Sequence, residues 1–160
     1  MFAQAEANYL EGISLSPAQR ALMEARLCSA VGRDVCIACG ALLRDPATPR
    51  HQKKLARKAL RKLCLEHSGG SATGELSVTL LLVPFRELDN EAVRRFAYEI
   101  IRSERFTLRA NAVMVLQRFA EHGDKRARAL LQLAVGDENP KVRENATIAA
   151  QNLRRYSKNR

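Results

Sequence analysis

One short pattern recurs in four segments of the chain and constrains its fold more than any other feature. The pattern reads apolar-basic-x-x-Ala-x-x-apolar-apolar, and its alanines are Ala56, Ala97, Ala112 and Ala146. Such spacing places the apolar residues on one side of a helix. The small alanine lets two helices approach closely, and the apolar pair packs against a neighbouring helix. We therefore expect an all-α protein built of repeated helices.

Start and stop signals divide the chain into about eight helices. Ser16, Pro17 and Gln19 form a capping box with proline at the first helical position, and Gly32 stands where a glycine would end that helix. The connections are short, which favours antiparallel neighbours. The expected helices cover residues 17–31, 33–44, 50–66, 75–88, 90–103, 107–122, 125–135 and 140–155.

The segment 75–88 carries conflicting signals. Its run Ser-Val-Thr-Leu-Leu-Leu-Val contains strand-like β-branched residues, and Pro84 would kink a helix. The glycine-rich segment 68–74 before it is expected to be a flexible loop. It is not a P-loop, because no Gly-Lys-Ser/Thr follows its glycines.

Two segments carry the repeat most fully, LLRDPATPRHQKKLARKALRKL and LLQLAVGDENPKVRENATIAAQNL. They resemble the HEAT-repeat family, whose units pair two antiparallel helices and stack into a solenoid. The resemblance covers residues 33–67 and 75–155. It implies a short right-handed α-solenoid in which the second helix of each unit lines the concave surface. It specifies architecture and hardly specifies function.

The length of 160 residues suits one compact domain. We expect a single domain over residues 1–160, in which residues 1–15 could be poorly ordered and residues 156–160 form a basic tail.

Positive charge is concentrated in two places. The formal charge of the chain is +10. Residues 49–67 contribute a net +6 and residues 139–160 a net +5, whereas the rest of the chain is close to neutral. A patch of this kind favours an acidic partner.

The segment 50–64, RHQKKLARKALRKLC, holds seven cations. At helical spacing these cations share one half of the helix, and Leu55, Ala56, Ala59, Leu60, Leu63 and Cys64 occupy the other half. Five like-charged i,i+4 pairs arise on this helix and would cost about 1–2.5 kcal/mol in isolation. Because this repulsion destabilises the helix, we expect acidic neighbours in the fold or an acidic ligand to offset it.

Three interpretations of this basic face stay open: a solvated helix surface, a site for an acidic protein, and a site for nucleic acid. If the face binds duplex DNA, the logarithm of the binding constant should fall with the logarithm of the salt concentration, with a slope near −0.9 for each phosphate contacted. The chain has no Trp, and Phe and Tyr do not alternate with the cations, which disfavours base stacking. The predicted partner-binding residues are Arg50, Lys53, Lys54, Arg57, Lys58, Arg61, Lys62, Lys141, Arg154 and Arg155.

The basic residue of the repeat has a structural interpretation. It follows a turn that contains Asp, and it can pair with that carboxylate; Asp137 and Arg143 are the expected pair. We expect Arg94, Arg109 and Arg143 to stabilise the fold.

The cysteines allow two interpretations. Cys36-Ile-Ala-Cys39 and Cys64-Leu-Glu-His67 have the spacing of a Cys3His zinc site. Cys28, Cys36, Cys39 and Cys64 all fall on apolar helix faces, however, where small hydrophobic residues belong. Core packing is therefore favoured over zinc or redox chemistry, and no cofactor is expected.

No set of residues indicates an enzyme or a small-molecule substrate, because the three histidines lie far apart and outside known nucleophile or metal motifs. The N-terminus lacks the features of a secretory signal, and no apolar run is long enough to span a membrane. Cysteines in such a chain indicate a reducing compartment, so a cytoplasmic protein is expected. The favoured function is that of a non-enzymatic scaffold that binds an acidic macromolecule, with binding of a nucleic-acid backbone as the alternative.

Overall fold

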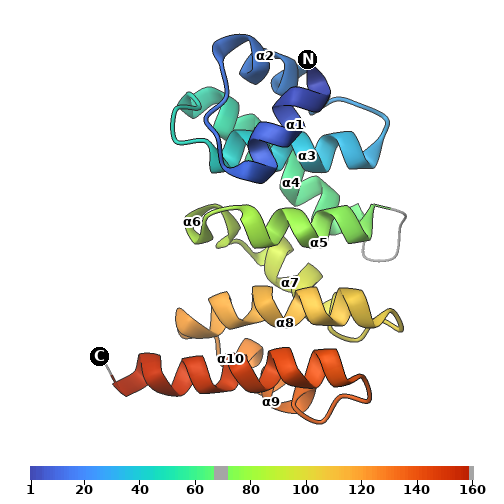
Figure 1. Cartoon of the computed structure of the whole chain (residues 1–160), viewed down its shortest axis with the longest axis vertical. Coiled ribbons are helices and arrows are strands. Elements are labelled where there is room, and N and C mark those ends of the chain that lie inside the picture. The colour runs from blue at the N-terminus through green and yellow to red at the C-terminus, as the bar shows by residue number, and fades with distance from the viewer. Residues whose placement is uncertain (67–71, 159–160) are drawn as a thin grey trace. The chain divides into compact units, whose positions relative to one another are not determined.

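The computed structural model describes residues 1–66 and 72–158, and this part of the chain is helical without any strand (Figure 1). The expectation of an all-α protein is confirmed. Ten helices occur in the described residues: α1 Phe2–Glu11, α2 Pro17–Arg26, α3 Gly32–Arg44, α4 Arg50–Glu66, α5 Thr73–Leu82, α6 Phe85–Leu88, α7 Glu91–Ile100, α8 Phe106–Glu121, α9 Lys125–Ala134 and α10 Pro140–Lys158.

The expected number of about eight helices was wrong, for two reasons. The segment 75–88 is helical but not continuous: Val83 is extended, with φ −75° and ψ 139°, and separates α5 from α6. Pro84 explains this break, since a proline disfavours helical geometry in the residue before it. The second addition is α1, which lies in the segment that the sequence suggested could be poorly ordered.

Helix α1 is attached to α3 by both apolar and polar contacts. Ala5 and Tyr9 are buried, and the two helices pack against each other. Gly12 ends α1 in a left-handed conformation, with φ 75°, which glycine adopts without strain. The guanidinium of Arg44 donates a hydrogen bond of 2.5 Å to the carbonyl oxygen of Tyr9 at this end. These contacts order the N-terminal helix without a side-chain N-cap.

The chain divides into two compact units, residues 1–92 and 93–160. In the first unit α3 is the central helix, and every residue from Val35 to Leu43 is buried. It packs against α1, α2, α4 and α5. The Ser16 capping box opens α2 as expected, since Gln19 both donates to the Ser16 hydroxyl and accepts from the Ser16 N–H.

Gly32 does not end the helix that was expected over residues 17–31. Helix α2 stops at Arg26 with Leu27 as its C-cap, and Gly32 is the first residue of α3. A Cβ atom at Gly32 would lie 2.9 Å from the Cβ of Ala72, which is closer than two such carbons can approach. The glycine is therefore explained by this close approach and not by a left-handed helix end.

In the second unit α8 takes the central place. It packs against α9 and α10, which also contact each other, and Figure 1 shows α8 and α10 side by side. Phe96 and Phe119 are among the largest fully buried side chains of the protein. Gly123, with φ 94°, follows the end of α8 as the sequence predicted. Each unit thus contains a central helix that packs against the two helices that follow it.

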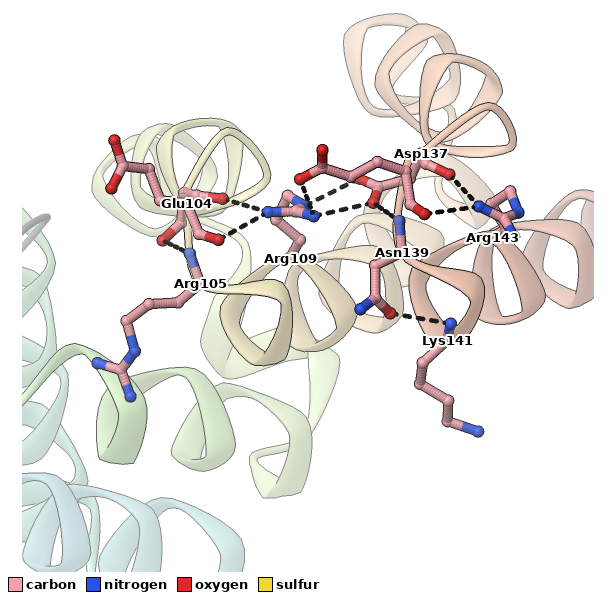
Figure 2. A network of polar contacts seen from close by, with 9 residues as sticks. Glu104, Arg105, Arg109, Asp137, Asn139, Lys141 and Arg143 are labelled. Atoms are coloured by element: carbon pink, nitrogen blue, oxygen red, sulfur yellow. Dashed lines mark hydrogen bonds and ion pairs between the residues drawn. The ribbon is translucent and has the colours of Figure 1, made fainter.

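The turns before α8 and α10 are held by arginines (Figure 2). Arg109 is buried and forms two parallel bonds with the carboxylate of Asp137, with Nε–Oδ2 2.8 Å and Nη2–Oδ1 3.0 Å. Arg143 instead donates to the backbone carbonyls of Asp137 and Glu138. The expected side-chain pair between Asp137 and Arg143 was therefore wrong, because Arg109, in the first turn of helix α8, binds that carboxylate. The structural role expected of Arg109 is confirmed.

Gly40→Ala is expected to destabilise the protein by about 1–3 kcal/mol through overpacking. A Cβ atom at Gly40 would lie 2.5 Å from the ring carbon Cζ of Tyr9 and would also overlap its hydroxyl. The ring is rigid and buried, so α1 would have to move away from α3. Urea unfolding measures the loss, and the additional substitution Tyr9→Leu should recover part of it.

A matched control for Gly40→Ala is Gly74→Ala. Nothing lies within 4 Å of a Cβ at Gly74 in α5, so this change should be neutral or stabilising by up to about 1 kcal/mol. Equal effects of the two substitutions would show that the contact with Tyr9 does not limit the packing of α1.

Candidate functional site

Helix α4 buries one side and exposes a basic side. Gln52, Ala56, Leu60, Leu63 and Cys64 are buried on the inner side. The side chains exposed on the opposite side are Arg50, His51, Lys54, Leu55, Arg57, Lys58, Arg61, Lys62, Leu65 and Glu66. Most of the predicted binding residues therefore lie together on one exposed helix surface, which we call the α4 basic face.

Two residues were assigned to the wrong side of α4. Lys53 is only 8% exposed, although the sequence placed it among the accessible cations. Leu55 is 44% exposed, although it was expected in the core. The buried side is centred between Ala56, Leu60 and Leu63, and this centre brings Lys53 inward and leaves Leu55 outside. A lysine tolerates such a position because its aliphatic stem can be covered while its ammonium reaches the surface.

One cation of the α4 basic face is neutralised within the first unit. Arg57 donates from Nε to Oε2 of Glu87 at 2.5 Å and from Nη2 to Oε1 at 3.2 Å. The Glu87 side chain, on α6, is 1% exposed, and its hydrogen bond raises the pKa of the Arg57 guanidinium. This pair joins α4 to α6 and makes Arg57 a structural residue more than a binding residue.

Four cations remain available on the α4 basic face. Within the described residues, no ion pair or hydrogen bond occupies the side chains of Arg50, Lys54, Lys58 and Arg61. Lys62 has only a long contact of 4.0 Å with Glu66 at the end of the helix. Glu87 thus relieves the predicted pairs that contain Arg57, whereas the like-charged pairs Arg50/Lys54 and Lys54/Lys58 have no acidic partner in the described part of the chain.

The α4 basic face carries an open groove with apolar as well as basic walls. The groove has a volume of about 910 Å³, and its walls include Lys54, Lys58, Arg61, Leu55 and Leu65. Leu65 is 63% exposed and lies three, four and seven residues after Lys62, Arg61 and Lys58. This spacing places it within the group of cations. The surface can therefore offer both charge and apolar contact to a partner.

The sequence interpretation missed Leu65 and Glu87. Leu65 could have been found by continuing the helical periodicity beyond Lys62. Glu87 gave no local signal, since it lies 30 residues after Arg57 in the chain.

The three other predicted binding residues lie in the second unit, on α10. Lys141, Arg154 and Arg155 are exposed, and Lys141 pairs with Glu144 at 2.9 Å. They belong to a different unit from the α4 basic face, so we describe the candidate site from α4 alone.

The cysteines divide into one exposed and three buried thiols. Cys36, Cys39 and Cys64 are buried in the core of the first unit, as the core-packing interpretation predicted. The same prediction for Cys28 was wrong, because Cys28 follows the end of α2 and is exposed. Burial raises the pKa of Cys36 and of Cys64 to about 12 and raises that of Cys39 as well. His67, the fourth residue of the possible zinc motif, lies outside the described residues. Within them, no group of three or more His, Cys, Asp or Glu side chains could hold a metal ion.

The thiols are expected to react in two classes. In the native protein at pH 8, an aromatic disulfide reagent should modify Cys28 rapidly, and the three buried thiols should react only on unfolding, because they are covered and protonated. The absorbance of the aromatic thiolate that the reagent releases measures how many cysteines have reacted before and after denaturation. Rapid modification of three or four thiols in the native state would contradict the packing described here.

None of the helices in the described ranges 1–66 and 72–158 combines the length and apolar character needed to cross a membrane. Comparison of the chain with family models, with curated proteins and with solved structures finds no match.

Proposed function

We propose that this chain is a non-enzymatic binding protein, built of HEAT-like helix pairs arranged as a short right-handed α-solenoid, and that the α4 basic face binds an acidic segment of a partner protein. The observation that carries this proposal is the group of unpaired cations at Arg50, Lys54, Lys58 and Arg61, set beside an open groove. Cations that have no acidic partner within the protein keep repelling one another until a ligand supplies negative charge.

The leucines favour a protein over nucleic acid as the ligand. Leu55 and Leu65 are 44% and 63% exposed within the same groove. A phosphate backbone offers these side chains little apolar surface. An acidic amphipathic helix, by contrast, has glutamates that can pair with the cations of the groove and leucines that can pack against Leu55 and Leu65. Binding to nucleic acid would use mainly the cations, and none of the described residues that line the groove is a Phe, Tyr or Trp available for base stacking.

Leu65→Ser is expected to weaken binding of an acidic amphipathic helix roughly five- to tenfold, because it removes an apolar contact worth about 1 kcal/mol. The probe is a synthetic helix with a leucine stripe flanked by glutamates, measured by fluorescence anisotropy. Leu133→Ser is the matched control, since Leu133 is 74% exposed on α9 of the other unit.

The same titrations with mixed-sequence duplex and single-stranded oligonucleotides decide between the two ligand classes. The proposal predicts that the amphipathic helix binds more tightly and that Leu65→Ser leaves any oligonucleotide binding unchanged. The nucleic-acid alternative would instead be established by two results together. The oligonucleotide would bind more tightly than the helix, and the logarithm of its binding constant would fall with the logarithm of the salt concentration at a slope near −0.9 per phosphate contacted.

A further inference from the structure

Arg109 and Arg143 occupy equivalent positions in the second unit. Each is the fourth residue of its helix, and the two lie 34 residues apart. Arg109 Nη1 donates to the carbonyl oxygens of Ser103 and Glu104, at 2.8 and 3.0 Å. Arg143 Nη1 donates to the corresponding carbonyls of Asp137 and Glu138, at 2.7 and 2.8 Å. Figure 2 shows the two guanidinium groups held in this way by the turns that precede them.

The rest of the Arg109 guanidinium binds carboxylates. Its Nε and Nη2 atoms form the parallel pair of bonds to Asp137, and Nη2 also donates to Oε1 of Glu138 at 3.2 Å. An arginine fixed by two backbone carbonyls thus presents its remaining N–H groups to an Asp-Glu pair. This planar arrangement matches the geometry of a carboxylate.

Arg143 is fixed in the same way but remains open on its other side. In the ranges 1–66 and 72–158 its Nε and Nη2 groups have no hydrogen-bond partner, and the residue is exposed. The backbone carbonyls already restrain its side chain. Little rotamer freedom would therefore be lost when a ligand binds.

The surface of α10 around Arg143 indicates what the ligand is. Thr147 and Arg154 follow Arg143 at spacings that place all three on one side of the helix, and all three are exposed. The corresponding residues of α8, Val113 and Ala120, are fully buried. An apolar helix packed here would bury the charge of Arg154 without a partner, so a polar segment fits better.

Charge makes a second copy of this chain a poor occupant. Residues 139–160 hold six basic residues and one acidic residue, and two such helices would repel each other. A segment that brings its own carboxylates would be attracted instead. Arg154, three turns along the same side, offers a second contact for a further acidic residue.

We propose that Arg143 is a preorganised anchor for an acidic turn of a partner protein, in which neighbouring Asp and Glu carboxylates bind its Nε and Nη2 groups as Asp137 and Glu138 bind Arg109. The site is separate from the α4 basic face and does not depend on the function proposed for that face.

The test uses a short peptide as the probe and NMR of the isotope-labelled full chain as the readout. The peptide acetyl-Val-Gly-Asp-Glu-Asn-Pro-amide copies residues 135–140, the turn whose carboxylates Arg109 binds. At low salt it should shift the Nε–Hε resonance of Arg143 in a saturable manner. The resonance of Arg109 is the internal control and should not move. A matched peptide with Asn and Gln in place of Asp and Glu should leave both resonances unchanged.

Two substitutions extend the test. Arg143→Lys keeps the positive charge but loses the planar guanidinium that can donate two parallel hydrogen bonds to a carboxylate. It should weaken peptide binding about tenfold. Thr147→Glu leaves the guanidinium contacts of Arg143 in place and should weaken binding about fivefold by repulsion. Thermal unfolding verifies that both variants are folded. The proposal is wrong if the acidic peptide leaves the Arg143 resonance unchanged, if the amide peptide binds equally well, or if Thr147→Glu has no effect.

Discussion

Arg109→Met is expected to lower the free energy of unfolding by about 3 kcal/mol, because it removes five hydrogen bonds from a covered guanidinium. The side chains of Arg109 and Asp137 are 9% and 13% exposed, so water replaces the lost contacts only in part. In the described residues the substitution leaves the Asp137 carboxylate with the N–H of Asn139 as its remaining hydrogen-bond donor. Urea unfolding at neutral pH measures the effect.

The effect of Arg109→Met should depend on pH in a defined direction. The hydrogen bonds from Arg109, and to a smaller extent the N–H of Asn139, hold the pKa of Asp137 below its ordinary value. A lowered carboxyl pKa stabilises the folded protein above the unfolded-state pKa, and this contribution is lost as the pH falls through the folded-state pKa. The difference in the free energy of unfolding between wild type and the Arg109→Met variant should therefore be largest at neutral pH and should shrink below about pH 4.

Arg143→Met is the matched control for Arg109→Met. The two arginines donate to equivalent backbone carbonyls, but Arg143 is exposed and binds no side-chain carboxylate in the described residues. Its removal should cost less than about 1 kcal/mol. If both substitutions cost the same, the carboxylates of Asp137 and Glu138 do not stabilise the second unit.

Helix boundaries were predictable where capping residues mark them. The Ser16 box, the stop at Asp45 and the start at Pro140 all appear in the structure as the sequence predicted. These signals are local, since each depends on hydrogen bonds between residues a few positions apart. The boundaries that failed lack such signals: Met1 provides no side-chain cap for α1, and α2 ends at Arg26 with Leu27, not a glycine, as its C-cap.

The α4 basic face was predictable in outline but not in detail. Periodicity separates the two sides of α4, yet it does not give the exact angle at which α3 covers the helix. A small rotation is enough to bury Lys53 and expose Leu55. The pairing of Arg57 with Glu87 depends on how α6 returns to α4, which no local pattern encodes.

Replacing Lys54, Lys58 and Arg61 together by Glu is expected to weaken binding of an acidic amphipathic helix about 100-fold or more at low salt. All three cations are exposed and unpaired, and the substitution converts attraction into repulsion along the middle of the groove. Lysine, arginine and glutamate have similar helix propensities, and the new glutamates make the pairs 50/54, 57/61 and 58/62 opposite-charged while the pair 54/58 stays like-charged. The free energy of unfolding should therefore not fall.

The control for this variant changes the same amount of charge elsewhere. Arg95, Arg102 and Lys125 are exposed in the second unit, and their replacement by Glu gives the same net charge as the α4 variant. Any loss of binding in this control measures the effect of overall charge alone.

The difference in dissociation constant between these two variants, for the acidic amphipathic helix at about 50 mM salt, tests the central claim most directly. The account predicts a loss of about 100-fold for the α4 variant and less than about fivefold for the control. Equal losses, or undiminished binding by the α4 variant, would contradict the assignment of the α4 basic face as the binding site.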